Sequence, residues 1–163
     1  LINDGNLKIT AYSVSHDPVD AALGYRIDYK GRSVSISGDT TYDQNLVNNS
    51  KNVDVLFHES MSLELLDIIN KQAKKSGNVV ADIVTIDILD YHTPILDVVK
   101  AAKEANVKHL VFYHHLPAPR NQLMEDIMYR GVDEVIEEWT ASHDGTMVIL
   151  PINSDEINIS LVN

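Results

Sequence analysis

The sequence predicts an α/β domain in which helices flank a mixed β-sheet. Three observations support this class. The first third of the chain contains short segments in which apolar and polar residues alternate, as they do in half-buried strands. The middle alternates helical spacing with short apolar runs, and the end returns to a strand pattern. We find no repeat or linker, so the 163 residues fit one domain.

The composition is that of a globular protein with an acidic surface. Hydrophobic residues make up 44% of the chain and charged residues 23%, which excludes a disordered chain. The formal net charge of −11 argues against nucleic-acid binding by this chain on its own. The absence of cysteine excludes disulfides, thiolate metal sites and cysteine nucleophiles. No apolar run approaches the roughly 20 residues of a membrane span.

Four strands are expected before residue 60. Residues 7–11 and 23–29 alternate at the period of a strand, and Lys30-Gly31 suits a hairpin turn into a strand around Val34 and Ile36. That strand ends at Ser37-Gly38-Asp39-Thr40. A compact apolar strand follows from Val53 to Phe57 and leads into His58-Glu59.

Helical spacing dominates the middle of the chain. Apolar residues from Leu65 to Ala73 predict a helix that stops at Gly77. Residues 79–89 fit a second helix, although a strand is an open alternative for so apolar a run. Thr93 can cap a third helix that begins at Pro94 and ends near Asn106.

The remaining elements are short. Residues 110–113 predict a strand that ends at His114-His115. Residues 121–130 and 132–139 predict two short helices separated by Gly131. Asp144-Gly145 predicts a turn between two strands, and residues 157–161 alternate as a last strand.

Ionisable side chains collect at the ends of these predicted strands. They are His16, Asp39, His58, Glu59, His92 and His114. Strand ends at one edge of an α/β sheet are where loops converge to form a site. Imidazole and carboxylate without thiolate is the ligand set of a hydrolytic zinc or manganese centre.

Each residue also has an interpretation without a metal. A histidine at a strand end is commonly a surface or capping residue. Asp39 fits a turn or the N-cap of a short helix at residues 42–47, and Glu59 fits the first turn of a helix. Thr93-Pro94 explains a helix start without any role for His92.

Several segments considered together resemble a known family. They are Ser15-His16-Asp17-Pro18, Ser37-Gly38-Asp39-Thr40, His58-Glu59-Ser60, Tyr91-His92-Thr93, residues 110–117 and Asp144-Gly145-Thr146. In this order they resemble the second half of metallo-β-lactamase-fold hydrolases, in the ribonuclease Z and arylsulfatase-like branch. The resemblance runs from about Leu7 to Pro151. It implies half of a four-layer αββα sandwich.

The resemblance assigns roles by position. His16 and His114 would each bind one of two divalent metal ions, most simply zinc and alternatively manganese, and Asp39 would bridge them. His114 is preferred to His115 because it lies three residues before Pro117, and because neighbouring strand residues point to opposite faces. Glu59 and His92 resemble the pair that assists proton transfer in the ribonuclease Z branch. His58, His109 and His143 are expected to be structural or surface residues.

One motif of the family is absent. The His-x-His-x-Asp-His motif, which lies N-terminal to the His16 segment in the family, does not occur here. The chain is therefore expected to be the C-terminal portion of such a fold, with two protein ligands for each ion. Catalytic zinc uses three. We expect the chain alone to bind metal weakly and to be inactive.

The resemblance implies a metal-dependent hydrolase of a phosphodiester, or else of an aryl sulfate or similar small ester. The net charge favours a small anionic substrate over tRNA. We expect no membrane partner, a cytoplasmic protein, and either the N-terminal portion or a second copy on an exposed sheet face. The alternative function is a non-catalytic interaction module that kept the fold.

Overall fold

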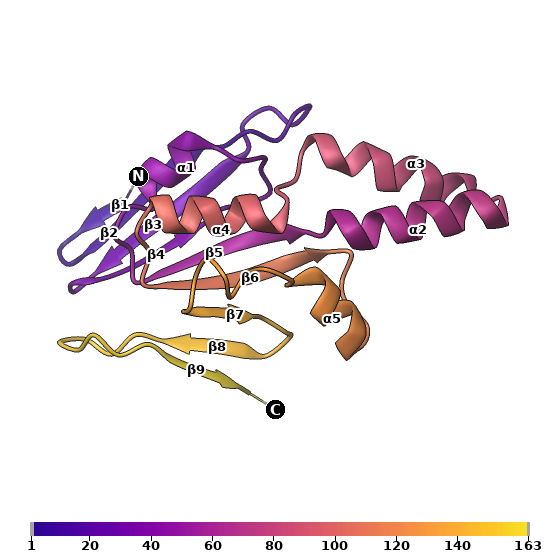
Figure 1. Cartoon of the computed structure of the whole chain (residues 1–163). Coiled ribbons are helices and arrows are strands. Elements are labelled where there is room, and N and C mark those ends of the chain that lie inside the picture. The colour runs from indigo at the N-terminus through magenta and orange to yellow at the C-terminus, as the bar shows by residue number, and fades with distance from the viewer. Residues whose placement is uncertain (1, 163) are drawn as a thin grey trace.

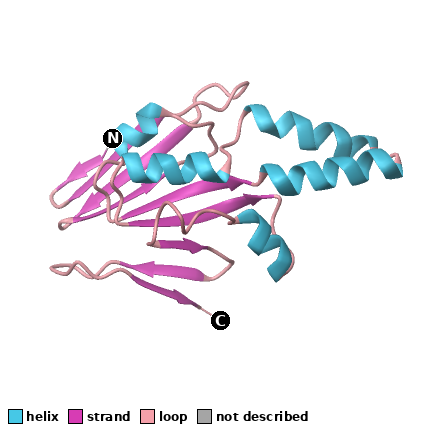
Figure 2. Ribbon diagram, viewed as in Figure 1, coloured by secondary structure: helices cyan, strands magenta, loops and turns pink. Residues whose placement is uncertain are grey.

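A seven-stranded mixed sheet forms the centre of the protein. The computed structural model describes residues 2–162, and its sheet has the order β1-β2-β3-β4-β5-β6-β7 (Figures 1 and 2). The strands are β1 Ile2–Asp4, β2 Leu7–Ser13, β3 Leu23–Tyr29, β4 Arg32–Ile36, β5 Val55–Met61, β6 His109–Leu116 and β7 Trp139–Ala141. Strands β1 to β4 pair antiparallel, and β4 to β7 pair parallel. The predicted mixed sheet is confirmed.

Helices connect the parallel strands. They are α1 Gln44–Asn49, α2 Leu63–Ser76, α3 Val79–Asp87 with the 3-10 turn Ile88–Asp90, α4 Ile95–Glu104 and α5 Gln122–Met128. Helices α1 and α4 cover one face of the sheet, and α2 and α3 form a hairpin that projects beyond it (Figure 1). Strands β8 Thr146–Ile149 and β9 Asn158–Leu161 make a separate antiparallel pair. No helix in residues 2–162 is long and apolar enough to cross a membrane.

The main core lies between the sheet and the helices. Leu46 of α1 and Val98 of α4 are fully buried against Leu56, Leu110 and Phe112 of β5 and β6. Burying one such side chain contributes roughly 1.5–3 kcal/mol, so this layer supplies much of the stability of the fold. The ends of β5 and β6 are thereby held in place.

The other face of the sheet carries apolar side chains that are only partly buried. Strand register places Ile27, Val34, Ile36 and Phe57 on this face, together with the exposed Tyr25 and Tyr29, and we call this surface the open face. Part of the C-terminal segment lies against it, with Thr146 beside Ile36 and Phe57, and Leu150 and Ile152 beside Ile27 and Val34. None of the described helices covers it.

Most of the predicted elements are present. The apolar run at residues 79–89 is helical, so its strand alternative is excluded, and Gly77 ends α2 in the left-handed conformation at φ 70°. Asp43, and not Asp39, caps α1 by accepting from the N–H groups of Asn45 and Leu46. Glu59 lies within β5, so its interpretation as a helix first-turn residue is wrong.

The predicted cap of α4 is also wrong. The Thr93 hydroxyl donates to the Thr40 carbonyl, so it is not available to the helix, and Pro94 occupies the N-cap position. The side chain therefore joins two loops of the site described below and does not start a helix.

The predicted helix at residues 132–139 is not formed. The segment makes a single turn, in which the Val132 carbonyl accepts from Val135 and Ile136, and β7 then begins at Trp139. The Trp139 ring packs edge-on against Phe112 and tilted against Tyr129, and β7 pairs with β6. Tertiary pairing outweighs local helical spacing here. Likewise the Asp144-Gly145 turn does not join paired strands, because β8 pairs with β9.

A buried ion pair fastens the C-terminal segment to the sheet. Arg32 and Asp54 are only 7% and 4% exposed, and their Nε–Oδ2 distance is 3.1 Å. Asp54 also accepts from the Ser33 N–H and from the half-exposed Lys108, while Arg32 donates to the carbonyls of Pro151 and Ser154. Burial alone would raise the pKa of Asp54, but these hydrogen bonds outweigh it and hold that pKa below its ordinary value.

We predict that Asp54→Asn lowers the free energy of unfolding by about 3 kcal/mol at pH 7, because it leaves a buried arginine charge unpaired. A depressed carboxyl pKa stabilises the fold above its unfolded value and loses that effect as pH falls through the folded one. The deficit should therefore shrink below about pH 4. Urea unfolding at both pH values checks this. Asp28→Asn, in the more exposed Arg26 pair, is the control and should cost under about 1 kcal/mol; equal effects would contradict the prediction.

Candidate metal centre

Strand polarity brings five of the predicted site residues to one edge of the sheet. Asp39 follows β4, Glu59 lies in β5, His114 lies in β6, and His16 follows β2. Strand β2 is antiparallel to β3, which is antiparallel to β4, so all four segments end at the same edge. His92 reaches this edge from the loop before α4.

The five side chains contact one another. The Asp39 Oδ1–His114 Nδ1 distance is 3.2 Å, and the ring centroid of His92 lies 5.1 Å from that of His16 and 5.5 Å from that of His114. Two groups place possible ligand atoms within 4.8 Å of one another, namely His16 with Asp39 and His92, and Glu59 with His92 and His114. His92 belongs to both groups, so it is a possible donor beside His16 and Asp39, and with Glu59 a possible donor beside His114; the sequence-based count of two ligands for each ion included neither His92 nor Glu59.

Gly38 lets the Asp39 loop approach β3. Its φ is 65°, and a Cβ at this position would lie 2.5 Å from the Leu23 carbonyl oxygen. Glycine alone accepts both the conformation and the approach without strain. The loop is therefore held where Asp39 can reach His114.

Glu59 is the fully buried centre of the cluster. Its Oε1 accepts from the N–H groups of Thr40 and Thr93, at 3.3 and 2.9 Å, and lies 3.1 Å from His92 Nδ1. Because an ionised carboxylate only accepts, the proton of this contact is on Nδ1 of His92. The Glu59 Oε2 is buried without a hydrogen-bond partner, which is costly unless a cation or a donor occupies the site.

His16 is oriented by a backbone group. Its Nδ1 lies 2.7 Å from the carbonyl oxygen of Tyr91, which can only accept, so Nδ1 carries the proton and the Nε2 lone pair is free. The Tyr91 ring packs edge-on against His16 and tilted against His92, with centroids at 5.1 and 5.0 Å. A second group that fixes the tautomer is typical of a metal-ligating histidine.

A β-bulge presents His114 to the cluster. Across β5 and β6, Glu59 pairs with Tyr113 and Ser60 with His115, so His114 is the inserted residue, at φ 44°. Bulges redirect a side chain in this way. The family's spacing to Pro117 selected His114 over His115, and alternation predicted that only one of the two faces the site; the bulge is the physical reason why His114 projects from the strand.

His115 lies in a different environment. Its Nε2 donates to the Ser142 carbonyl at 2.8 Å, and Nδ1 accepts from the hydroxyls of Tyr129 and Ser60, both at 3.0 Å. Burial lowers the pKa of His115, so the ring is neutral. Both ring nitrogens of His115 are therefore occupied by hydrogen bonds to protein groups.

The other histidines also lie outside the cluster. His58 is buried and donates from Nδ1 to the Glu59 carbonyl, and burial lowers its pKa. His109 contacts the Thr140 hydroxyl, and burial lowers its pKa as well. His143 lines a shallow hollow with Tyr113.

Sequence reasoning assigned no function to three contributors to the site. Thr40 and Thr93 act through backbone N–H groups, which no side-chain pattern reveals. Tyr113 lies 3.4 Å from the Ser37 hydroxyl, and burial and the nearby acidic groups raise its pKa. The sequence feature that could have indicated a role for Tyr113 is its position directly before His114-His115.

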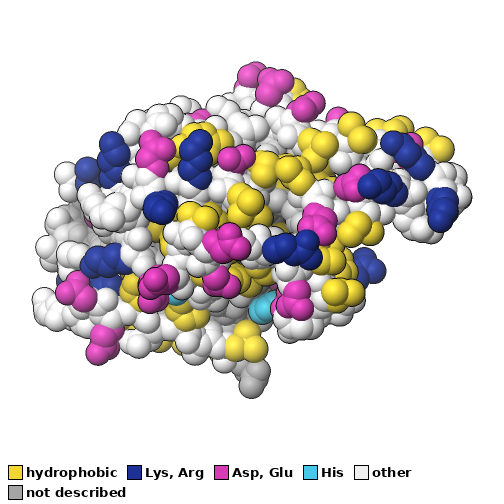
Figure 3. Space-filling model, viewed as in Figure 1, with side chains coloured by type: hydrophobic (Ala, Val, Ile, Leu, Met, Phe, Trp, Pro, Cys, Tyr) yellow, Lys and Arg dark blue, Asp and Glu magenta, His cyan; other side chains and the backbone are white. Residues whose placement is uncertain are grey.

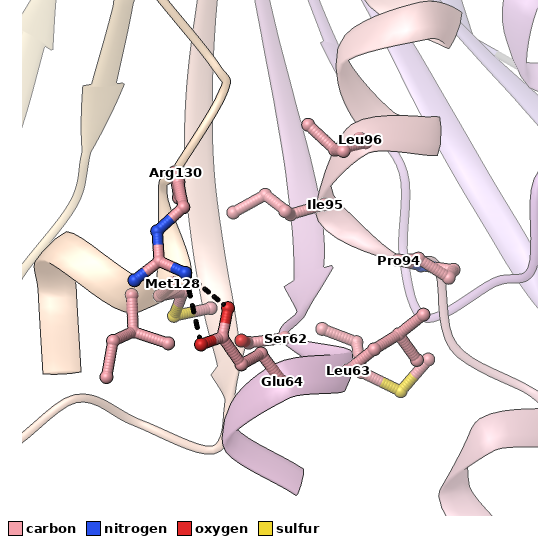
Figure 4. A pocket seen from close by; sticks show the side chains of 10 residues that line it. Ser62, Leu63, Glu64, Pro94, Ile95, Leu96, Met128 and Arg130 are labelled. Carbon is pink, nitrogen blue, oxygen red and sulfur yellow. Dashed lines mark hydrogen bonds and ion pairs between the residues drawn. The ribbon is translucent and has the colours of Figure 1, made fainter. Parts of the chain in front are cut away.

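An apolar pocket of about 290 Å³ lies between the starts of α2 and α4 and the end of α5 (Figure 4). Leu63, Ile95, Leu96 and Met128 line it, and Arg130 pairs with Glu64 beside it. None of the five clustered residues lines this pocket. The cluster and the pocket are therefore separate features.

The histidine tautomers can be tested directly. We predict that long-range ¹⁵N–¹H spectra at pH 8 show neutral His16 protonated at Nδ1 because it donates to the Tyr91 carbonyl. His115 is the internal control and should be protonated at Nε2. Finding His16 protonated at Nε2 would contradict the proposed orientation of its ring.

Comparison with known proteins agrees with the observed fold. No family model matches the chain. Over 103 residues, or 63% of this chain, it is 31% identical to a ribonuclease Z of Mycobacterium tuberculosis, of which 34% is matched. It is 29% identical over 112 residues to a ribonuclease Z of Mycobacterium avium, of which 36% is matched. The chain thus spans about a third of these relatives' length.

Solved structures share its architecture. The metallo-β-lactamase-fold protein YhfI of Bacillus subtilis superposes with a TM-score of 0.57 and 20% identity, covering 85% of this chain and 47% of that one. A long-form ribonuclease Z from yeast superposes with a TM-score of 0.56 and 19% identity, covering 85% of this chain and 17% of that one. The expected resemblance is confirmed: the chain has the mixed sheet and flanking helices of the metallo-β-lactamase fold and resembles its ribonuclease Z branch.

Proposed function

We propose that this chain forms one side of the dinuclear metal centre of a hydrolase that cleaves a small phosphodiester. The observation that carries the proposal is the convergence of His16, Asp39, Glu59, His92 and His114, which come from five separate segments. The Glu59 Oε2 is buried without a hydrogen-bond partner, which a cation or a donor at the site would supply.

The donor set fits divalent metal ions. His16 and His114 would each bind one ion and Asp39 would bridge the two, and zinc is favoured, with manganese as the alternative, because all donors are imidazole or carboxylate. The free Nε2 of His16 supports this assignment. When bound, such a pair of ions supplies a nucleophilic hydroxide at neutral pH and offsets the charge that develops on the phosphoryl group.

Glu59 and His92 would together transfer a proton to the leaving group. Glu59 holds His92 through Nδ1, which leaves Nε2 as the atom that exchanges a proton with the substrate. The two backbone N–H bonds to Glu59 keep the pair in one geometry.

The proposed substrate class is based on the net charge of the chain and on the names of the proteins that match it in sequence. The proteins that match in sequence are named ribonuclease Z, which favours phosphodiester cleavage. The net charge of −11 disfavours tRNA binding by this chain and favours a small anionic ester. An aryl sulfate is the alternative small ester that the test below includes.

The open face is where the remaining ligands would come from. Val55, Phe57 and Glu59 alternate along β5, so the row of open-face side chains runs into the cluster. If Glu59 and His92 serve proton transfer, each ion has two ligands from this chain, one fewer than catalytic zinc uses. We infer that a segment packed on the open face, from outside residues 1–163 or from a second copy, completes the set.

Metal binding by the chain alone should therefore be weak. We predict a zinc dissociation constant above about 1 μM by isothermal titration calorimetry, and weakening by about tenfold or more in Asp39→Asn. His109→Gln lies outside the cluster and should leave binding unchanged. Tight binding of two ions by the wild-type chain would contradict the proposed ligand count.

In the complete protein, His92→Gln should lower kcat for bis(p-nitrophenyl) phosphate by about 10²–10⁴-fold, since it removes the proton donor. Bound metal, measured by mass spectrometry, should remain. His109→Gln, which lies outside the cluster, is the matched control and should retain activity. Preferential hydrolysis of p-nitrocatechol sulfate would overturn the substrate class. If the metal-loaded protein hydrolyses neither ester, the alternative of a non-catalytic interaction module replaces the proposal.

A further inference from the structure

A hollow of about 550 Å³ opens beside His114. Its walls come from two segments, namely the end of β6 with the loop that follows it, and the turn after β7. Clefts that bind small molecules commonly enclose about 300–1,000 Å³. Because His114 itself lines the hollow, a molecule bound there would lie next to the metal-binding cluster.

Hydrogen bonds fix the two walls of the hollow relative to each other. The His115 Nε2 donates to the Ser142 carbonyl at 2.8 Å, and the Ser142 N–H donates to the Phe112 carbonyl at 2.9 Å. The His143 N–H donates to the Thr146 hydroxyl, and the Thr146 N–H donates to the His143 carbonyl, both at 2.9 Å. The backbone of the turn is therefore held in place against β6.

The ring of His143 differs from the other histidine rings of the chain. Each of the other six has a hydrogen-bond or ion-pair partner in the protein. The His143 ring is exposed and forms no hydrogen bond or ion pair within residues 2–162. Its backbone is fixed by the turn, whereas its imidazole, in the wall of the hollow, is available to a bound molecule.

The residues that line the hollow favour a neutral aromatic group. Tyr113, Pro119 and His143 supply ring surfaces, and Ala118 adds a small apolar side chain. Aromatic rings pack favourably on one another when their centroids lie about 4.5–7 Å apart. Among the described residues that line the hollow there is no lysine or arginine, whereas Asp144 is present, so a second anionic group is disfavoured there.

The wider surface also gives no support to a long anionic strand. On the face of the molecule shown in Figure 3, Lys and Arg side chains are interspersed with Asp and Glu and form no continuous basic surface. A polynucleotide that continued past the cluster would need cations along its backbone. A small diester with an uncharged aromatic group needs none beyond the metal centre.

We propose that the hollow beside His114 binds the organic group that stays on the phosphorus of the diester, and that this group is a neutral aromatic ring packed against His143. The inference rests on the proposed function and defines its substrate more closely. His92, which would protonate the leaving group, does not line the hollow. The hollow therefore suits the retained group, while the bond from phosphorus to the other ester oxygen is the one that breaks.

Two diesters with the same p-nitrophenolate leaving group test the retained group. In the complete, metal-loaded protein, Ala118→Trp should fill the hollow and lower the ratio of kcat/KM for phenyl p-nitrophenyl phosphate to that for methyl p-nitrophenyl phosphate by about tenfold or more. Leu123→Trp, at an exposed position of α5 outside the hollow, is the control and should leave this ratio unchanged. An unchanged ratio in Ala118→Trp, or the same fall in both variants, would overturn the proposal.

Substitution of His143 tests the ring contact without adding bulk. His143→Ala should lower the same ratio by about threefold to tenfold, chiefly through a higher KM for the phenyl diester. His143→Phe should retain the wild-type ratio because it keeps a flat ring at this position. If His143→Gln retains the ratio and His143→Phe does not, the residue acts through a hydrogen bond and the proposed ring contact is wrong.

A binding measurement distinguishes failure of this inference from failure of the proposed function. By isothermal titration calorimetry, the metal-loaded protein should bind diphenyl phosphate at least about tenfold more tightly than dimethyl phosphate, and Ala118→Trp should remove the difference. If this holds but no diester is hydrolysed, the hollow is a binding site and the hydrolase function is wrong. If diesters are hydrolysed but diphenyl phosphate has no advantage, the function stands and the assignment of the hollow is overturned.

Discussion

The buried carboxylate of Glu59 is the interaction on which the site depends. A carboxylate is costly to bury unless donors surround it, and here the three donors come from two different loops. Its Oε1 receives the Thr40 N–H beside Asp39, the Thr93 N–H at the start of α4, and the His92 ring. One side chain therefore fixes the mutual positions of the segments that carry Asp39 and His92. The Thr93–Thr40 hydrogen bond joins the same two loops a second time.

The sheet supplies the rest of the geometry. Strands β2, β4, β5 and β6 end at the same edge, and the bulge between Glu59 and Ser60 turns His114 out of the ladder. His115, one residue later, is held by Ser142, Tyr129 and Ser60 and keeps the strand in register. A fully hydrogen-bonded histidine thus lies next to one that projects into the cluster and contacts Asp39. The two residues have the same chemistry, and their different surroundings determine their different roles.

The protein carries two apolar surfaces, and their physical origins differ. The open face is the second side of a sheet whose first side is covered by α1 and α4. It leads directly into the cluster, so whatever covers it lies close to the metal site. The second surface consists of the exposed aliphatic side chains of α3, among them Val79, Val80 and Ile83. The polar side of α3 faces α2, because Asn70 forms hydrogen bonds with Asp82 and Thr85 inside the hairpin, so these aliphatic side chains point outward.

The sequence alone determined the fold class and most element positions, because periodicity and turn residues are local properties of the chain, and its resemblance to a known family pointed to the five clustered residues. It did not determine the strand at Trp139, which depends on pairing with β6 and on the edge-on contact with Phe112, or the loop-joining role of Thr93. It suggested a capping role for Asp39, but Asp43 has the geometry to cap. Only the tertiary structure decided that His114 lies on a bulge, that backbone N–H groups hold Glu59, and that α3 is packed with its apolar side in water. These features depend on contacts between residues far apart in the chain, which no local pattern encodes.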